Sequence, residues 1–312
     1  MATVEYINGP SKKEPFTASS FLQYMRKSSP HWWSDNPKET ECPWVFRGHW
    51  DSDWKLIPTA ARPNFEGVPE FKSIVGSLRT ELESDCKSWP NLKGIEQDII
   101  LRCYAHISVI IKFIDIAQDL SFSLPNTSLS RSPLTFSQYV DSILLDQSGN
   151  FENNRHWLNG ISRNLLRKRR FGRKRGFSRM SPSFYLNATV ALAQHHGVPT
   201  FMLDWSEGPL VACLFAATKP ERLSAENGLC VWALKRSSLP VRLSSLKDDW
   251  TSGGVIQVIK PDKANNQYLS RQSGVLSSIS GGDNFWMRNE IYPDLETVFN
   301  QLDNLFEENH IS

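Results

Sequence analysis

Short runs of aromatic and β-branched residues alternate along this chain with longer segments of helical periodicity, and the spacing between them is irregular. Runs of strand length occur at 44–48, 200–203, 228–234, 255–259 and 274–279. A doubly wound sheet needs strands and helices in regular succession, which these runs do not keep. The sequence therefore predicts an α+β fold.

Apolar residues recur every three or four positions in the longer segments, which is the spacing of an amphipathic helix. We expect one helix over Phe21, Leu22 and Met25, capped by the Thr-Ala-Ser-Ser run at 17–20. A buried helix is predicted at 209–217. Further helices are predicted at 69–86, 95–120, 136–145, 184–195 and 290–308.

The length of 312 residues allows one large domain or two small ones, and a 40% share of apolar residues is enough for a core. We divide the chain into an N-terminal segment at 1–43, a central domain at 44–280 and a C-terminal helical segment at 281–312. Ser, Asn, Pro and Arg dominate residues 121–182. We interpret this stretch as a basic insertion or arm within the central domain.

Membrane, secreted and metal-binding classes are disfavoured. There is no run of about 18 apolar residues, so no membrane-spanning helix is expected. The first residues lack a basic region followed by an apolar stretch, so we expect no signal peptide and a cytoplasmic location. The five cysteines form no C-x-x-C pair, so reduced core thiols are expected instead of disulfides or a metal site.

Positive charge is concentrated in one stretch. Residues 163–179 hold nine of the 35 basic residues and no acid, which leaves 26 basic against 33 acidic residues elsewhere. Phe171 and Phe177 lie between the cations, which suits a phosphate backbone with stacked bases. An acidic partner protein or a solvated surface would also account for the charge. The predicted nucleic-acid contacts, with RNA favoured, are Arg167, Lys168, Arg169, Arg170, Arg173, Lys174 and Arg175.

Three motifs carry a family resemblance. They are WVFRGHWDSDWKLIPT at 44–59, ALAQHHGVPT at 191–200 with LDWS at 203–206 and PLVA at 209–212, and RQSGVL at 271–276. In order and spacing they resemble the FRG-domain family, named for the Phe-Arg-Gly at 46–48. The resemblance covers 44–120 and 183–280, whereas 121–182 lies outside the family pattern.

The FRG layout is similar in turn to the ADP-ribosyltransferase fold, which implies a mixed sheet, NAD as a substrate and no metal. In that superfamily an Arg or His on the first strand holds NAD, a polar turn follows the second strand, and a Glu or Gln near a late strand carries the transfer. The resemblance implies that the catalytic residues are Arg47, Asp204 and Gln272. It implies that the residues binding NAD are Arg47, Gly48, Trp50, Trp205 and Ser206.

These residue types suit the reaction. Breaking the nicotinamide–ribose bond creates oxocarbenium-like charge, so the site must clamp the phosphates and orient the ribose. Arg47 offers a planar fork of donors, and Gly48 would let the backbone approach a ligand closely. Either Trp50 or Trp205 could stack on a ring. Asp204 would accept from ribose hydroxyls.

Gln272 departs from the pattern of many active transferases, which carry a Glu there. A neutral amide cannot act as a base or stabilise positive charge as a carboxylate does. Three explanations remain open. Another acid serves (Glu207, Asp204 or Glu290), the target supplies a reactive group, or the protein only binds a nucleotide.

Structural roles compete with these functional ones. Arg47 and Asp204 could form a buried ion pair that only joins two segments. His195 and His196 precede Gly197 at a predicted helix end, where capping is the expected role for at least one of them. A Ser-His-Asp hydrolase is not predicted, because no G-x-S-x-G elbow surrounds Ser206.

The resemblance and the basic arm together predict an ADP-ribosyltransferase-like effector that modifies nucleic acid, as a toxin or a phage-defence component. An acidic antitoxin or other neutralising partner is then expected. The alternative is a non-catalytic module that senses a nucleotide and binds nucleic acid within a toxin–antitoxin or defence complex. A structural subunit that scaffolds a complex is the third possibility.

Overall fold

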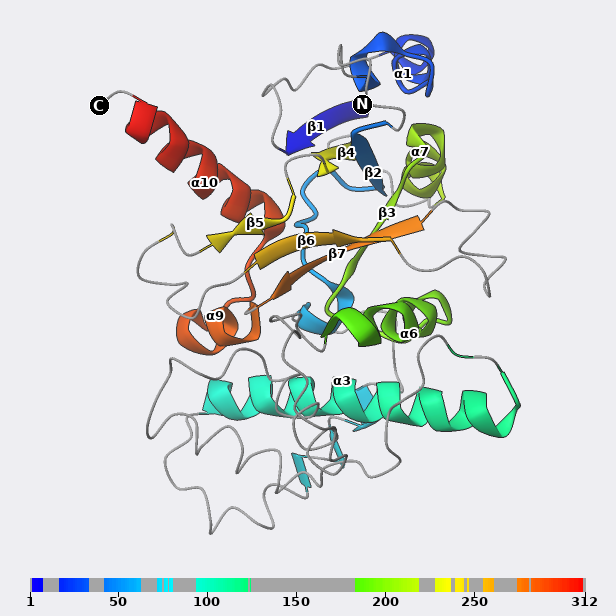
Figure 1. Cartoon of the computed structure of the whole chain (residues 1–312), viewed down its shortest axis with the longest axis vertical. Coiled ribbons are helices and arrows are strands. Elements are labelled where there is room, and N and C mark those ends of the chain that lie inside the picture. Colours follow the sequence, from blue (N-terminus) through cyan, green and yellow to red (C-terminus); the bar gives the residue numbers. More distant parts are fainter. Residues whose placement is uncertain are drawn as a thin grey trace, which may run out of the picture.

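The computed structural model describes residues 2–7, 17–33, 42–62, 72–74, 76–77, 79–80, 94–122, 124, 183–218, 228–236, 239–243, 246, 255–260, 274–280 and 282–310. Figure 1 shows that these residues form a sheet with helices packed around it. The α+β class expected from the sequence is confirmed.

Among the described residues, the sheet has seven strands. Its order is β1 (Ala2–Ile7), β4 (Leu229–Lys235), β2 (Trp44–His49), β3 (Leu203–Ser206), β7 (Gly274–Ser280), β6 (Val255–Ile259) and β5 (Val241–Arg242). Only β1 and β4 run parallel, and every other neighbouring pair is antiparallel. The sheet is therefore mixed, with β2 and β3 at its centre.

Alternate residues of the central strands enter two different cores, as the period of two in a strand requires. Val45 of β2 packs against α10 (Leu295–His310), which contributes Val298, Phe299 and Leu302. Phe46, the next residue, packs instead on the side of α7 (Pro209–Ala217). The sheet is thus covered on both faces.

The second of these cores also holds the N-terminal elements. Phe21 of α1 (Ala18–Tyr24) and Trp32 of the short 3-10 helix η1 (Pro30–Trp32) are buried beside Phe46. Thr17 caps α1, because its side-chain oxygen accepts from the Ser20 backbone N–H at 3.2 Å. The capped helix predicted here is confirmed.

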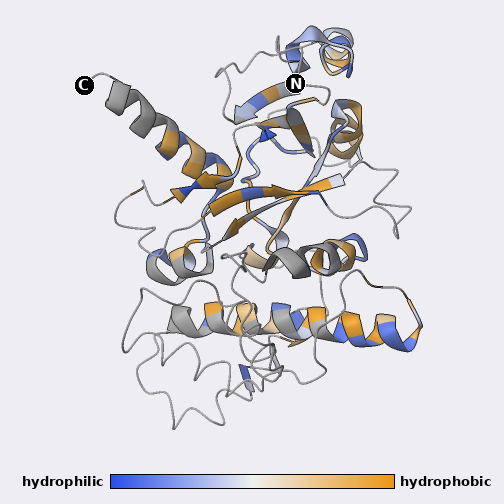
Figure 2. Cartoon of the chain, viewed as in Figure 1, coloured by the Kyte–Doolittle hydropathy of each residue, from blue (hydrophilic) through white to orange (hydrophobic). Residues whose placement is uncertain are grey.

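A third core joins the remaining helices to the sheet. Ile110 and Ile114 of α3 (Gly94–Asp119) face Val190 of α6 (Ser183–His195), and Leu276 of β7 completes the contact. Apolar and polar residues alternate around α3 in Figure 2, as an amphipathic helix requires. The 3-10 helix η2 (Thr59–Ala61) contributes the buried Ala60 and Ala61 on the chain that follows β2.

Most elements match the sequence prediction. The strands expected at 44–48, 228–234, 255–259 and 274–279 are β2, β4, β6 and β7, and the helices expected at 95–120 and 184–195 are α3 and α6. Of the helix predicted at 69–86, residues 72–74, 76–77 and 79–80 are described and helical. The helix predicted at 136–145 lies outside the described residues.

Several predictions were wrong in extent. The strand expected at 200–203 begins only at Leu203 and runs to Ser206. The helix expected at 290–308 is α10, which begins only at Leu295, because Glu290 has a positive φ of 60° and Pro293 follows before α10 starts. A separate helix, α9 (Gly282–Asn289), precedes it and was not predicted. Helix α7 has its predicted bounds but is buried on one side only, with Leu210, Leu214 and Phe215 exposed.

The terminal segments belong to the same body as the central region. Residues 1–43 supply β1, which pairs with β4 along its whole length, and this strand was not predicted. The C-terminal segment supplies α10, whose apolar residues enter the core of β2, β3 and β4. Among the described residues, no helix is both long and apolar enough to cross a membrane.

Candidate functional site

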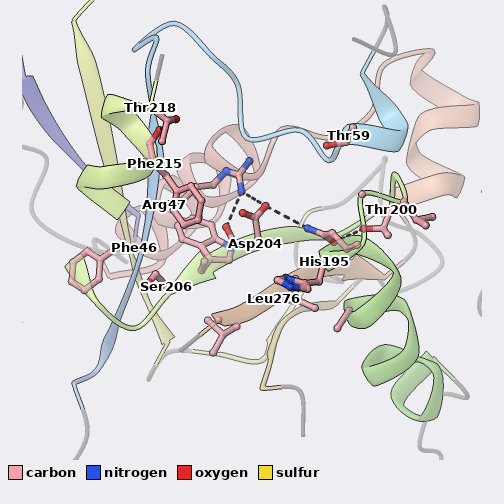
Figure 3. A pocket seen from close by; sticks show the side chains of 18 of the residues that line it. Phe46, Arg47, Thr59, His195, Thr200, Asp204, Ser206, Phe215, Thr218 and Leu276 are labelled. Atoms are coloured by element: carbon pink, nitrogen blue, oxygen red, sulfur yellow. Dashed lines mark hydrogen bonds and ion pairs between the residues drawn. The ribbon is translucent and has the colours of Figure 1, made fainter. Parts of the chain in front are cut away.

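A cavity of about 560 Å³ opens where β2 and β3 meet the ends of two helices. Figure 3 shows Arg47 and Asp204 beside each other at this cavity, with Phe215 of α7 and the following Thr218 on one side and His195 and Thr200 on the other. Gly274, Val275 and Leu276 of β7 also line it. The volume falls within the range of small-molecule sites, which is roughly 300–1,000 Å³.

The side chain of Arg47 links β2 and β3 beyond the point where their main chains pair. Strands β2 and β3 pair only at Phe46 and Ser206. Past that point the Nη1 group of Arg47 donates to the Asp204 main-chain oxygen at 2.8 Å and to its carboxylate Oδ1 at 2.5 Å. The Arg47 side chain is only 12% exposed. One guanidinium therefore bridges the two central strands at the cavity.

Asp204 keeps its carboxylate at the surface of the cavity. Its side chain is 63% exposed, whereas Leu203, Trp205 and Ser206 on the same strand are buried. Desolvation in the cleft raises the pKa of this carboxyl, but the charge of Arg47 and its hydrogen bond outweigh that effect and hold the pKa below its usual value. Asp204 is therefore ionised at neutral pH and accessible to a ligand.

A short relay supports Asp204 from α6. Gln194 donates from Nε2 to Asp204 Oδ1 at 3.4 Å, and its Oε1 accepts from the Thr200 hydroxyl at 2.5 Å. The Thr200 oxygen in turn accepts from the Met202 backbone N–H at 3.2 Å. Because its oxygen receives a hydrogen bond from Thr200, the Gln194 amide is oriented with its NH₂ group toward Asp204.

His49 supports Arg47 from the other side. Its Nε2 accepts from Arg47 Nε at 2.9 Å, and its Nδ1 lies 3.2 Å from the main-chain oxygen of Trp54. The imidazole is 2% exposed. Burial, then the charges of Arg47 and Arg62, lower the pKa of His49 to about 3, so this histidine is neutral at physiological pH.

His49, Gln194 and Thr200 were not among the site residues predicted from the sequence. His49 stands two positions after Arg47 on one strand, so both side chains leave the same face, and this period is the signal that could have found it. Gln194 and Thr200 carry no comparable signal, because the contact of Gln194 with Asp204 depends on how α6 lies against β3, and Thr200 acts through Gln194.

Trp50 and Trp205 differ in how accessible their rings are for stacking on a ligand. Both residues line the cavity, and the ring of Trp50 lies edge-on to Trp54 at a centroid distance of 4.4 Å. Trp205 is 3% exposed, its indole donates to Ser277 Oγ at 2.8 Å, and it packs in the core with α10. Of the two rings considered for stacking, Trp50 is the one available.

Gly48 and Ser206 have structural reasons for their identity. A Cβ added to Gly48 would lie 1.9 Å from the Ala212 carbonyl oxygen, so the close approach that this glycine permits is to α7. Ser206 is buried, and its hydroxyl oxygen accepts from the Gly208 N–H at 3.0 Å just before α7 begins. Both residues position α7, which forms one wall of the cavity.

Glycine ends α6. Gly197 has a φ of 86°, its N–H donates to the Gln194 carbonyl at 2.9 Å, and the Val198 N–H donates to the Ala193 carbonyl at 3.0 Å. This is a Schellman ending, in which backbone groups satisfy the last carbonyls. His195 lines the cavity, and burial followed by the charge of His196 lowers its pKa.

The three acids considered as substitutes for a catalytic Glu differ in whether they line the cavity. Glu207 accepts from Arg236 at 2.8 Å and from Lys260 at 3.1 Å, and it is not among the residues that line the cavity. Glu290 ends α9 and does not line the cavity either. Asp204 is therefore the only acid among the described residues that line it.

Gln272 and the seven predicted nucleic-acid contacts (Arg167, Lys168, Arg169, Arg170, Arg173, Lys174 and Arg175) lie outside the described residues. Gln272 precedes Gly274, which lines the cavity, by two positions in the chain. Within the described part of the chain, no cluster of three or more His, Cys, Asp or Glu could hold a metal ion.

A family model described as the FRG domain matches residues 126–224, which include α6, β3 and α7 and hence Gln194, Asp204 and Ser206. The match also includes residues 126–182, which the sequence analysis placed outside the family pattern, and it begins well after Arg47. Neither a curated protein nor a solved structure gave a significant match.

Proposed function

Because this chain carries a domain of the FRG family, we propose that its cavity binds NAD and that the protein is an ADP-ribosyltransferase-like effector acting on nucleic acid. One observation carries the proposal. A fixed guanidinium and an ionised, exposed carboxylate face the same cavity, beside the aromatic ring of Trp50. These are the three kinds of group that phosphate, ribose and a heterocyclic base require.

Arg47 is the only cation among the described residues that line the cavity, apart from the histidine His195, whose pKa is lowered. Its Nε and Nη1 groups are engaged by His49 and Asp204, so in this proposal Nη2 contacts a phosphate oxygen of NAD. Asp204 accepts from a ribose hydroxyl. Trp50 stacks on the nicotinamide or the adenine ring.

In the proposed reaction the bond between ribose C1′ and the nicotinamide nitrogen breaks, and nicotinamide leaves with the bonding electrons. A nucleophilic oxygen or nitrogen of the target forms the new bond to C1′ and releases its proton to a base or to solvent. The ionised Asp204 stabilises positive charge that develops on the ribose. Gln272 orients the attacking group.

The target proposed is nucleic acid, with RNA favoured, because residues 163–179 combine nine cations with two phenylalanines and no acid. A protein that modifies cellular RNA has to be restrained in its own host. We therefore infer a toxin or phage-defence role with a neutralising partner of acidic character, which would cover the same basic segment.

A second candidate function is a nucleotide sensor that does not catalyse. This function is supported by the lowered pKa of Asp204, which is the only acid among the described residues that line the cavity. A carboxyl whose pKa is lowered by an arginine is a weak base. With Gln in place of Glu at 272, the site then holds a nucleotide without a strong base for the acceptor.

Labelled NAD distinguishes the two functions. Purified protein is incubated with ³²P-NAD and, separately, with cellular RNA, DNA and protein, and the label is traced in each fraction. The transferase predicts label in RNA that is lost in Arg47→Ala and Asp204→Asn. Arg242→Ala, which removes an exposed arginine of β5 outside the cavity lining, serves as the matched control and should retain transfer.

Absence of label from every fraction, with wild-type protein that is folded and binds NAD, would exclude the transferase and leave the sensor. Absence of NAD binding as well would exclude both and favour a scaffold. Label transferred equally by wild type and Arg47→Ala would place the reaction somewhere other than this cavity.

A further inference from the structure

Two of the three nitrogen atoms of the Arg47 guanidinium donate hydrogen bonds within the protein. Its Nε–H donates to His49, and Nη1 donates to the two oxygens of Asp204. Among the described residues, Nη2 has no hydrogen-bond partner, and Arg47 lines the cavity. The planar fork can therefore present only its Nη2 corner to a ligand.

The contact from Nε defines the state of His49. An arginine is always protonated and can only donate, so the nitrogen that it meets at 2.9 Å must carry a free lone pair. That assigns the hydrogen of the imidazole to Nδ1, which donates to the main-chain oxygen of Trp54 at 3.2 Å. The surroundings fix one neutral tautomer of a side chain that is 2% exposed.

An arginine side chain turns about its Cδ–Nε bond unless Nε is held. Asp204 holds Nη1, but its carboxylate is 63% exposed and can turn toward a ligand. His49 is buried and anchored to the main chain through Trp54. It is thus the stationary member of the two groups that orient Arg47.

We propose that His49 is a positioning residue, which holds the Arg47 guanidinium so that Nη2 meets a phosphate oxygen of the nucleotide in the cavity. The proposal rests on the proposed function, in that Arg47 contacts the ligand. His49 itself touches no ligand. It affects the affinity for the nucleotide through its Nε2 atom, which accepts the hydrogen bond from Arg47 Nε.

Two substitutions separate the contacts of the imidazole. Gln can place its side-chain oxygen near the position of Nε2, so His49→Gln keeps an acceptor for Arg47. Asn reaches only as far as Nδ1, so His49→Asn keeps a donor for Trp54 and removes the acceptor. His31→Asn, at an exposed histidine of η1, is the control.

Isothermal titration of each variant with NAD measures the effect. We expect His49→Gln to bind within about threefold of wild type and His49→Asn to bind about tenfold more weakly or worse, at matched thermal stability. Equal affinity of His49→Asn and wild type would overturn the proposal. So would equal losses in both variants with equal loss of stability, because that result indicates a structural role alone.

A second measurement does not depend on any ligand. An N–H···N hydrogen bond gives a scalar coupling between its two nitrogens, so ¹⁵N NMR of wild type should show one between Arg47 Nε and His49 Nε2. The coupling should vanish in His49→Asn. If wild type binds no NAD, the proposed function fails, and the coupling still decides the positioning role. Its absence from the folded protein would overturn that role.

Discussion

Arg47 and Asp204 lie 157 positions apart in the chain and are joined by two hydrogen bonds from one nitrogen, at 2.8 Å to the main chain and 2.5 Å to the carboxylate. The contact lies just past Phe46 and Ser206, the residue pair through which β2 and β3 are bonded. The same pair of side chains therefore joins the two central strands and lines the cavity.

Asp204→Asn tests whether this pair is structural or functional. The main-chain contact of Arg47 survives the substitution, and the carboxylate is 63% exposed, so we expect the free energy of unfolding to fall by only about 0.5–1 kcal/mol. Urea denaturation measures this. A loss above about 3 kcal/mol would identify a structural ion pair of the buried kind.

Gly48→Ala should move α7 and deform the cavity. The new Cβ would lie 1.9 Å from the Ala212 carbonyl oxygen and 2.7 Å from the Ala216 nitrogen, and neither backbone atom can turn aside. We expect a loss of about 2–4 kcal/mol in unfolding free energy. Gly76→Ala is the control, because Gly76 is helical with no atom within 4 Å of the added Cβ, and it should stabilise by about 0.5–1 kcal/mol. Similar effects at both positions would contradict the packing seen here.

Thr200→Val removes the relay that orients Gln194. Thr200 is 1% exposed, and its hydroxyl both donates to Gln194 and accepts from the Met202 N–H, so its loss leaves buried groups unpaired. We expect a stability loss of about 1–3 kcal/mol and weaker NAD binding, measured by thermal unfolding and titration. Thr200→Ser keeps the hydroxyl and should restore both. Wild-type stability and NAD binding in Thr200→Val would show that the relay contributes to neither.

The stability of the protein should depend on pH below neutrality. Burial lowers the folded-state pKa of His49 and His106 to about 3, so below pH 6.5 the unfolded chain binds more protons than the folded one. The stabilisation from each neutral imidazole is complete above about pH 6.5 and is lost as the pH falls toward 3. His195, whose pKa is also lowered, adds an effect of the same sign.

Unfolding in urea at pH 6 and pH 5 measures this dependence. Two buried histidines predict a fall of about 2–3 kcal/mol per pH unit. His106→Asn should reduce the slope by about half, whereas His31→Asn, at an exposed histidine, should leave it unchanged. A flat profile between pH 7 and pH 5 would contradict the buried neutral state of both imidazoles.

The main outlines of the fold followed from local patterns. The periodic apolar residues of α3 and the β-branched runs of β2, β4, β6 and β7 mark elements whose bounds the structure reproduces closely. Strand β1 escaped prediction because Ala2–Ile7 is a short edge strand defined by its pairing with β4. Helix α9 escaped because a Gly-Gly-Asp start resembles a turn.

The candidate site was only partly predictable for a related reason. Arg47 and Asp204 stood within recognisable motifs, so both were expected. The role of Gln194 depends on a contact between α6 and β3 that no local pattern records, whereas His49 could have been found from its position two residues after Arg47 on one strand. Trp205 borders the cavity next to Asp204, yet it is almost entirely buried in the core, because successive side chains of a strand point to opposite faces of the sheet.

The basic segment makes a separate prediction for nucleic acid. Replacing Arg167, Lys168, Arg169, Arg170, Arg173, Lys174 and Arg175 by Gln should weaken RNA binding and flatten its dependence on salt, because fewer counterions are released. Filter binding between 50 and 200 mM salt, roughly the range in which this effect is large, measures the slope. NAD binding should be unchanged. An unaltered salt slope would point to the acidic protein partner instead.

The most direct test of the cleft is the binding of NAD to three proteins by isothermal titration: wild type, Arg47→Ala and the exposed-arginine control Arg242→Ala. Both proposed functions require a nucleotide on Arg47, so we predict measurable affinity in wild type and the control, and a loss of at least about tenfold in Arg47→Ala with the fold retained. Equal affinity in all three, or none in folded wild type, would contradict the assignment of this cavity as a nucleotide site.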